Sequence, residues 1–124
     1  LKALDGPVTL KFFFSDSLPA VPVPLKHFAK QVEDLLQEYA LASGGRVRVE
    51  TYDPQPDSDA EEWAERYGLI SERLDPMEPA FYMGLVAVKG ETQAALPFLD
   101  PRNDQLLEYQ ISQMLARAAN RPSR

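Results

Sequence analysis

Hydrophobic and polar residues alternate with two different periods along the chain, and the shorter period predicts strands. Residues 8–14 are almost continuously apolar and aromatic, which is typical of a strand buried on both faces of a sheet. Residues 46–52 alternate between apolar and polar side chains, which predicts a half-exposed strand at or near a sheet edge. A second strongly apolar strand is predicted over residues 80–88, and Lys89-Gly90-Glu91 turns the chain into a hairpin partner over residues 92–98.

Apolar residues at helical spacing predict three helices, over residues 24–43, over residues 58–67 and from residue 103 or 104 to residue 119. Gly44-Gly45 provides the left-handed residues that end the first helix. Ser58 and Glu61 have the spacing of a capping box at the start of the second helix. We expect three side chains of the second helix to point inward, with its tryptophan in the core: Trp63, Ala64 and Tyr67.

The order of these elements is β-α-β-α-β-β-α, which predicts an α/β fold with a mixed four-stranded sheet and helices on both faces. The two strongly apolar strands belong inside the sheet. Strand 8–14 is therefore expected between strands 46–52 and 80–88, with strand 92–98 at the far edge. Residues 71–79 are expected to form a polar connection, and the chain of 124 residues is expected to form one domain.

Composition and charge narrow the classes of function. The chain has no cysteine, which excludes disulfides, thiol catalysis and thiolate metal sites. Its net charge of -6 repels phosphate backbones, so we expect no nucleic-acid partner. The sequence has one histidine and no glycine-rich nucleotide motif, so we expect neither a metal nor a cofactor.

Three short stretches resemble parts of the thioredoxin fold. Residues 64–69 resemble the end of the helix that precedes the third core strand of thioredoxins. Glu78-Pro79-Ala80-Phe81 resembles the proline-containing step into that third strand, and Lys89-Gly90 resembles the hairpin turn that follows it. The resemblance implies a thioredoxin-like fold. Thioredoxins carry a Cys-x-x-Cys pair after the first strand, whereas this chain has Ser15-Asp16-Ser17 there. Without a thiolate, the implied domain has no dithiol exchange.

Five further phrases, taken in order, resemble the extracytoplasmic region of gliding-motility-type ABC transporter auxiliary proteins. They are residues 35–39, 52–57, 82–86, 97–99 and 107–111. The resemblance implies a membrane-anchored parent protein on the periplasmic face of the inner membrane, with the permease and ATPase subunits of an ABC transporter as partners. Because the chain begins with Leu1 rather than Met, we expect it to be a piece of that longer protein, with any anchor outside it.

Two regions are candidate binding surfaces. One is the loop after the first strand together with the proline step, namely Ser15, Asp16, Ser17 and Pro79. Pro79 either holds a cis bond at a peptide-binding cleft or simply begins a strand. The other is the edge strand with Arg46 and Arg48, because the backbone of an edge strand can pair with another strand. The leading expectation is a non-enzymatic domain that binds a transporter subunit, a neighbouring domain or a transported substrate.

Two alternative functions stay open. A thiol-free peptide-binding or chaperone module would use the same loop. A hydrolase would need Ser15 or Ser17 beside His27 as the base. Against the hydrolase, His27 shares a polar helix face with Gln31 and Asp34, and neither serine lies in a nucleophile-elbow motif, so we expect no catalytic residue.

The acidic residues near the second helix have two interpretations. They are Asp53, Asp57, Asp59, Glu61 and Glu62. A calcium loop of the EF-hand type needs a glycine at its bend, but prolines interrupt these acids and no glycine falls among them. We therefore favour capping of the helix and compensation of its dipole.

Overall fold

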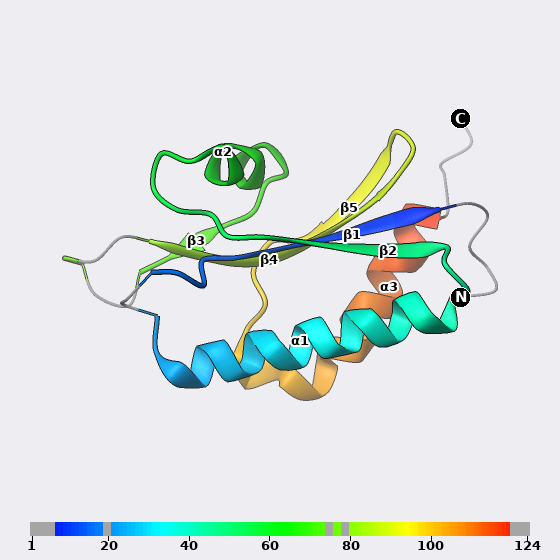
Figure 1. The fold of residues 1–124 in the computed structure, drawn as a ribbon, viewed down its shortest axis with the longest axis horizontal. Helices are drawn as coiled ribbons and strands as arrows, with labels where there is room; N and C mark the ends of the chain where they lie inside the picture. Colours follow the sequence, from blue (N-terminus) through cyan, green and yellow to red (C-terminus); the bar gives the residue numbers. More distant parts are fainter. Residues whose placement is uncertain (1–6, 19–20, 74–75, 78–79, 120–124) are drawn as a thin grey trace.

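Strand β1 (Val8–Phe14) lies in the middle of a mixed sheet, as its apolar sequence predicts (Figure 1). It pairs in parallel with β2 (Val47–Tyr52) on one side and antiparallel with β4 (Phe81–Lys89) on the other. Strand β5 (Thr92–Leu96) forms the predicted hairpin with β4. The computed structural model describes residues 7–18, 21–73, 76–77 and 80–119.

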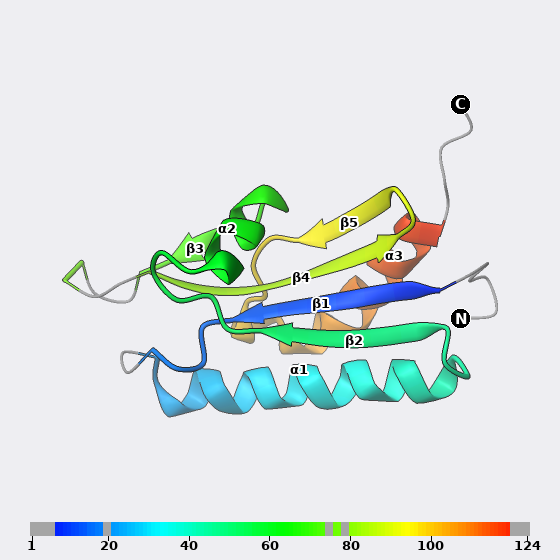
Figure 2. The same ribbon diagram turned by 45° about the horizontal axis from the view of Figure 1, so that its top comes forward.

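Helices cover both faces of the sheet, which confirms the predicted α/β architecture. Helices α1 (Val23–Ala42) and α3 (Leu107–Ala119) pack on one face, and the short helix α2 (Asp59–Arg66) packs on the other (Figure 1). The turned view shows α1 running next to β2 at one edge of the sheet (Figure 2). Within the described ranges, no helix is long and apolar enough to cross a membrane.

The side chains of β1 alternate between two apolar clusters. Leu10 and Phe12 belong to the larger cluster beneath α1 and α3. Phe13 belongs to the smaller cluster beneath α2, together with Ala64 and Val86. Phe12 and Phe13 are each only 1% exposed, and full burial of such a side chain contributes about 1.5–3 kcal/mol. One strand therefore anchors both helix layers.

The ends of the first two helices follow the predicted signals. Gly44 and Gly45 have φ angles of 67° and 95°, the left-handed conformation that ends α1. At the start of α2, the Ser58 hydroxyl accepts a hydrogen bond from the backbone N–H of Glu61 at 3.2 Å. The Glu61 carboxylate accepts one from the N–H of Asp57 at 2.9 Å, one residue before the expected partner. These bonds confirm the capping role of Ser58 and Glu61.

Three differences from the predicted elements are larger than one residue at an end. The sheet has five strands rather than four, because β3 (Ser71–Glu72) pairs antiparallel with the first two residues of β4. A strand of two residues is too short to produce a periodic pattern, so the sequence predicts only a connection there. Strand β5 ends at Leu96 because Pro97 has no N–H to continue the ladder. A 3-10 helix, η1 (Pro101–Leu106), precedes α3, whereas the sequence predicts that the α-helix begins at residue 103 or 104.

The prediction that Trp63 lies in the core is wrong, because its side chain is 47% exposed. Helix α2 has only eight residues, and the residue that it buries against the sheet is Ala64. Trp63 lies on the flank of the helix instead, with its ring centroid 5.8 Å from that of Tyr67.

We predict that Gly84→Ala lowers the free energy of unfolding by about 1–3 kcal/mol, because the added methyl group overpacks the sheet. A Cβ atom at Gly84 would lie 2.8 Å from Cδ2 of Leu69 and 3.0 Å from the carbonyl oxygen of Pro97. Urea denaturation measures the change. In the double variant with Leu69→Ala, the two losses should be less than additive, because the shorter contact is gone. A Gly84→Ala variant as stable as the parent would contradict this close approach.

Candidate functional site

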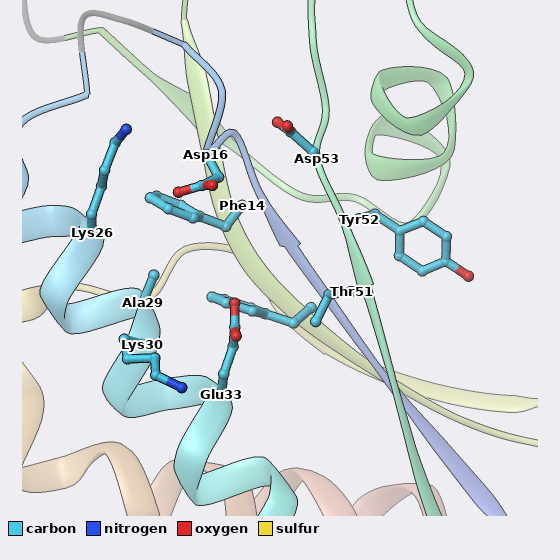
Figure 3. Close-up of a pocket in the computed structure, with 10 residues that line it drawn as sticks. Phe14, Asp16, Lys26, Ala29, Lys30, Glu33, Thr51, Tyr52 and Asp53 are labelled. Atoms are coloured by element: carbon cyan, nitrogen blue, oxygen red, sulfur yellow. The ribbon is translucent and has the colours of Figure 1, made fainter.

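A cleft of about 410 Å³ opens where the parallel strands β1 and β2 end and α1 begins. The carboxyl ends of adjacent parallel strands are a common place for binding clefts in α/β folds. Figure 3 shows the side chains around this cleft. They come from the ends of both strands and from the first half of α1: Phe12, Phe14, Asp16, Lys26, Ala29, Lys30, Glu33, Thr51, Tyr52 and Asp53.

The floor of the cleft is aromatic and rigid. The rings of Phe12 and Phe14 stack at 6.2 Å between centroids with 8° between their planes, and both side chains are almost fully buried. Ala29 of α1 also lines the cleft and lies near Phe14 (Figure 3). Both rings belong to β1, which is held on both sides by neighbouring strands.

The walls of the cleft carry more acidic than basic groups. Asp16 follows β1, Asp53 follows β2, and Glu33 lies on α1. Lys30 also lines the cleft, but its ammonium pairs at 3.1 Å with Asp34, which is not among the lining residues. Lys26 is the second basic group of the lining. Carboxylates around an open cleft suit an amine or guanidinium group of a bound molecule, because such a group can donate charge-assisted hydrogen bonds to them.

Ser15 lies inside the fold rather than on the predicted binding surface. Its backbone N–H donates to the Tyr82 carbonyl oxygen at 3.1 Å, and its hydroxyl accepts from the Tyr82 N–H at 2.9 Å. The residue is fully buried. These two bonds tie the start of the loop to β4, so Ser15 positions its neighbours and is not accessible to a partner.

Asp16 and Ser17 are both exposed, and Asp16 lines the cleft. The N–H of Ser17 donates to the Asp53 carboxylate at 3.4 Å, which joins the ends of β1 and β2. Pro79 lies outside the described residues, and so does the peptide bond that precedes it.

Arg46 and Arg48 lie at the opposite end of the sheet from this loop. The register pairs Val8 with Val47 and Thr9 with Arg48, at the beginning of both strands. Both arginines are exposed. The structure therefore places Arg46 and Arg48 at one end of the parallel strands and the Asp16–Ser17 loop at the other end.

His27 is exposed on α1, on the polar face that its spacing predicts. Gln31, Asp34 and Glu38 share that exposed face. The Ser15 hydroxyl is already engaged by Tyr82. Within the described part of the chain, no serine hydroxyl forms a hydrogen bond with His27.

The Lys11 ammonium lies within a cluster of aromatic rings that the sequence did not predict. The ammonium of Lys11 donates to the Tyr67 hydroxyl at 3.1 Å. It also lies 5.4–6.0 Å from the ring centroids of Tyr52, Trp63 and Tyr67, which is cation–π distance. These residues come from β1, β2, α2 and the position just after α2, so no local pattern joins them. Figure 3 shows the Tyr52 ring turned away from the cleft.

The hydrogen bond from the Tyr52 hydroxyl to the Glu50 carboxylate, 2.5 Å long, raises the pKa of Tyr52 to about 12. Partial burial and the negative charge of Glu50 act in the same direction. The bond requires the protonated phenol, because only that form donates to the carboxylate.

We predict that Ser15→Ala lowers the free energy of unfolding by about 1–3 kcal/mol, because the buried Tyr82 N–H loses its acceptor. Ser17→Ala is the matched control and should change it by less than about 0.5 kcal/mol, since this side chain is exposed. Urea denaturation compares the two variants. Equal effects would contradict the structural role of Ser15.

We predict that Tyr52 is deprotonated well above the ordinary tyrosine pKa of about 10. Its contribution to stability should be complete below about pH 10 and lost as the pH rises to about 12, because the folded-state pKa is the higher one. Ultraviolet titration of tyrosinate, with Tyr52→Phe to assign the step, measures this. Glu50→Gln should lower the pKa of Tyr52, whereas Glu91→Gln in the β4–β5 turn should not. An unchanged pKa in Glu50→Gln would contradict the assigned cause.

Comparison with curated proteins and with solved structures found no match. A model of one family, described as Domain of unknown function (DUF7088), matches residues 1–88. The matched segment includes β1, α1 and β2, which together form the cleft, and it stops before β5 and α3. The chain belongs to this family, described as Domain of unknown function (DUF7088).

Proposed function

We propose that this domain is a redox-inactive, non-enzymatic binding module of an ABC-type transport system. The observation that carries the binding role is the open cleft at the ends of β1 and β2, with its aromatic floor and excess of carboxylates. The groups around it are suited to hold a partner through charge and shape. The Ser15 hydroxyl, a candidate nucleophile of the hydrolase alternative, is engaged by Tyr82, so we rank that alternative last.

The transport context of the proposal comes from the sequence phrases that resemble gliding-motility-type ABC transporter auxiliary proteins. By that resemblance, the domain works on the periplasmic face of the inner membrane, within a parent protein whose anchors lie outside this segment. A permease subunit is then the direct partner, and the ATPase subunit is reached through it. Neighbouring domains of the parent protein are the other partners that the resemblance implies.

We also infer a thioredoxin-like relationship for the fold. The sheet order β2-β1-β4, with β5 paired to β4, supports it, as does the placement of α2 on the face opposite α1 and α3. In this relationship, Ser15-Asp16-Ser17 occupies the place of the reactive thiols. Thioredoxins use this loop position for thiol exchange, whereas this domain carries polar groups suited to binding there.

A thiol-free peptide-binding or chaperone module is the second candidate. The exposure of Ser17 and of Asp16, which lines the cleft, favours it. The pairing of Ser15 with Tyr82 weighs against it, because those backbone groups are not available to an added peptide.

We predict that a photo-crosslinking amino acid at Asp53, in the full-length parent protein within native membranes, forms an adduct with a permease subunit. The reason is that Asp53 lies at the mouth of the cleft. Mass spectrometry identifies the adduct, and the ATPase subunit should copurify with it.

The matched control places the same crosslinker at Glu91, an exposed residue in the β4–β5 turn. A permease adduct at Asp53 but not at Glu91 would support the transport role. Adducts at Asp53 with many unrelated unfolded chains would favour the chaperone alternative. No adduct, or equal adducts at both positions, would contradict the proposal.

A further inference from the structure

The outer edge of β2 presents unpaired backbone groups. Within the described ranges, β2 pairs with β1 alone. The N–H of Val8 donates to the Arg46 carbonyl oxygen at 2.7 Å, which shows that Arg46 directs its backbone groups toward β1. Because these groups alternate along a strand, those of Arg48 and Glu50 also face β1, and those of Val49 and Thr51 face outward.

The two ends of this edge differ in whether their outward backbone groups have a hydrogen-bond partner. At its beginning, the outward N–H of Val47 is capped by the Ser43 hydroxyl at 2.8 Å. At Val49 and Thr51, no part of the described chain supplies such a partner. Proteins commonly protect an exposed edge with a proline or a bulge, yet β2 has no proline and keeps continuous register with β1. The open part of the edge is therefore the half nearer the cleft.

The cleft lies along this open half of the edge. Thr51 near the end of β2 and Asp53 just after it line the cleft, and Lys26, Lys30 and Glu33 line it from α1 (Figure 3). A strand added to β2 would lie about 4.8 Å from it. Alternate side chains of that strand would point toward the α1 side of the sheet, into the cleft.

The charges around the cleft determine which side chain of the added strand would be complementary to it. Asp16, Glu33 and Asp53 supply three carboxylates, while Lys30 is already paired with Asp34. Lys26 alone then opposes three acids. A net charge of -6 over the whole chain acts in the same direction. The complementary side chain is lysine or arginine, whose aliphatic stem suits the aromatic floor.

We propose that β2 receives an extended segment of a partner protein as an added strand, with a lysine or arginine of that segment in the cleft. Backbone pairing at Val49 and Thr51 supplies affinity, and the acidic cleft supplies the preference for a basic residue. This inference rests on the proposed binding role and specifies the chemistry of the partner.

The test is a selection of random ten-residue peptides displayed on phage against the 124-residue chain. We expect enrichment of peptides with one or more basic residues in an otherwise extended, alternating sequence. Val49→Pro should weaken binding of the selected peptides about tenfold or more, because it removes an outward donor without touching the bonds to β1. Urea denaturation of the variant verifies that it folds.

A charge reversal supplies a second test that leaves the backbone intact. Glu33→Lys in the cleft should weaken the same peptides about tenfold, whereas Glu91→Lys, the same change in the exposed β4–β5 turn, should leave binding unchanged. Absence of enrichment, enrichment without basic residues, or equal effects of the two reversals would overturn the inference. The library contains no transporter subunit, so its outcome is independent of the crosslinking to the permease.

Discussion

The structure depends on the burial of β1 on both of its faces. Phe12 and Phe14 point to the layer of α1 and α3, and Phe13 points to the layer of α2. A strand that is apolar on both faces must be covered on both faces, and it must also pair at both edges to satisfy its backbone. The parallel partner β2 and the antiparallel partner β4 meet that second requirement. Sheet order and helix placement follow from this one segment.

The same constraint determines where the candidate site lies. Burial of the strand extends through Ser15, which is bonded twice to Tyr82, so the exposed loop begins only at Asp16. The parallel pairing of β1 and β2 then brings Asp53 to the same end of the sheet, where the Ser17 N–H reaches it. The cleft is thus a product of two strands that end together and a helix that begins beside them.

Helices cover the two faces of the sheet unequally, and charged and polar side chains lie on the less covered face. The long helices α1 and α3 bury the larger cluster, whereas α2 covers only part of the other face. On that face, Lys11 stays partly exposed, and its charge is accommodated by aromatic rings and the Tyr67 hydroxyl. The hydrogen bond from Tyr52 to Glu50 lies on the same side. Thin coverage therefore permits charged and aromatic residues to mix without an unsatisfied buried group among the described side chains.

The sequence alone determined the burial of β1, the edge position of β2, the caps at Gly44 and Ser58, and the absence of thiol chemistry. Each of these properties follows from the identity, or from the apolar and polar spacing, of residues that are close together in the sequence. Only the tertiary structure decided the burial of Ser15, the exposure of Trp63, the short strand β3 and the grouping of Asp16, Glu33 and Asp53. These depend on register and on the angle at which a helix meets the sheet. A periodic pattern reports which way a side chain faces in its own element, but it carries no information about which distant residue lies opposite.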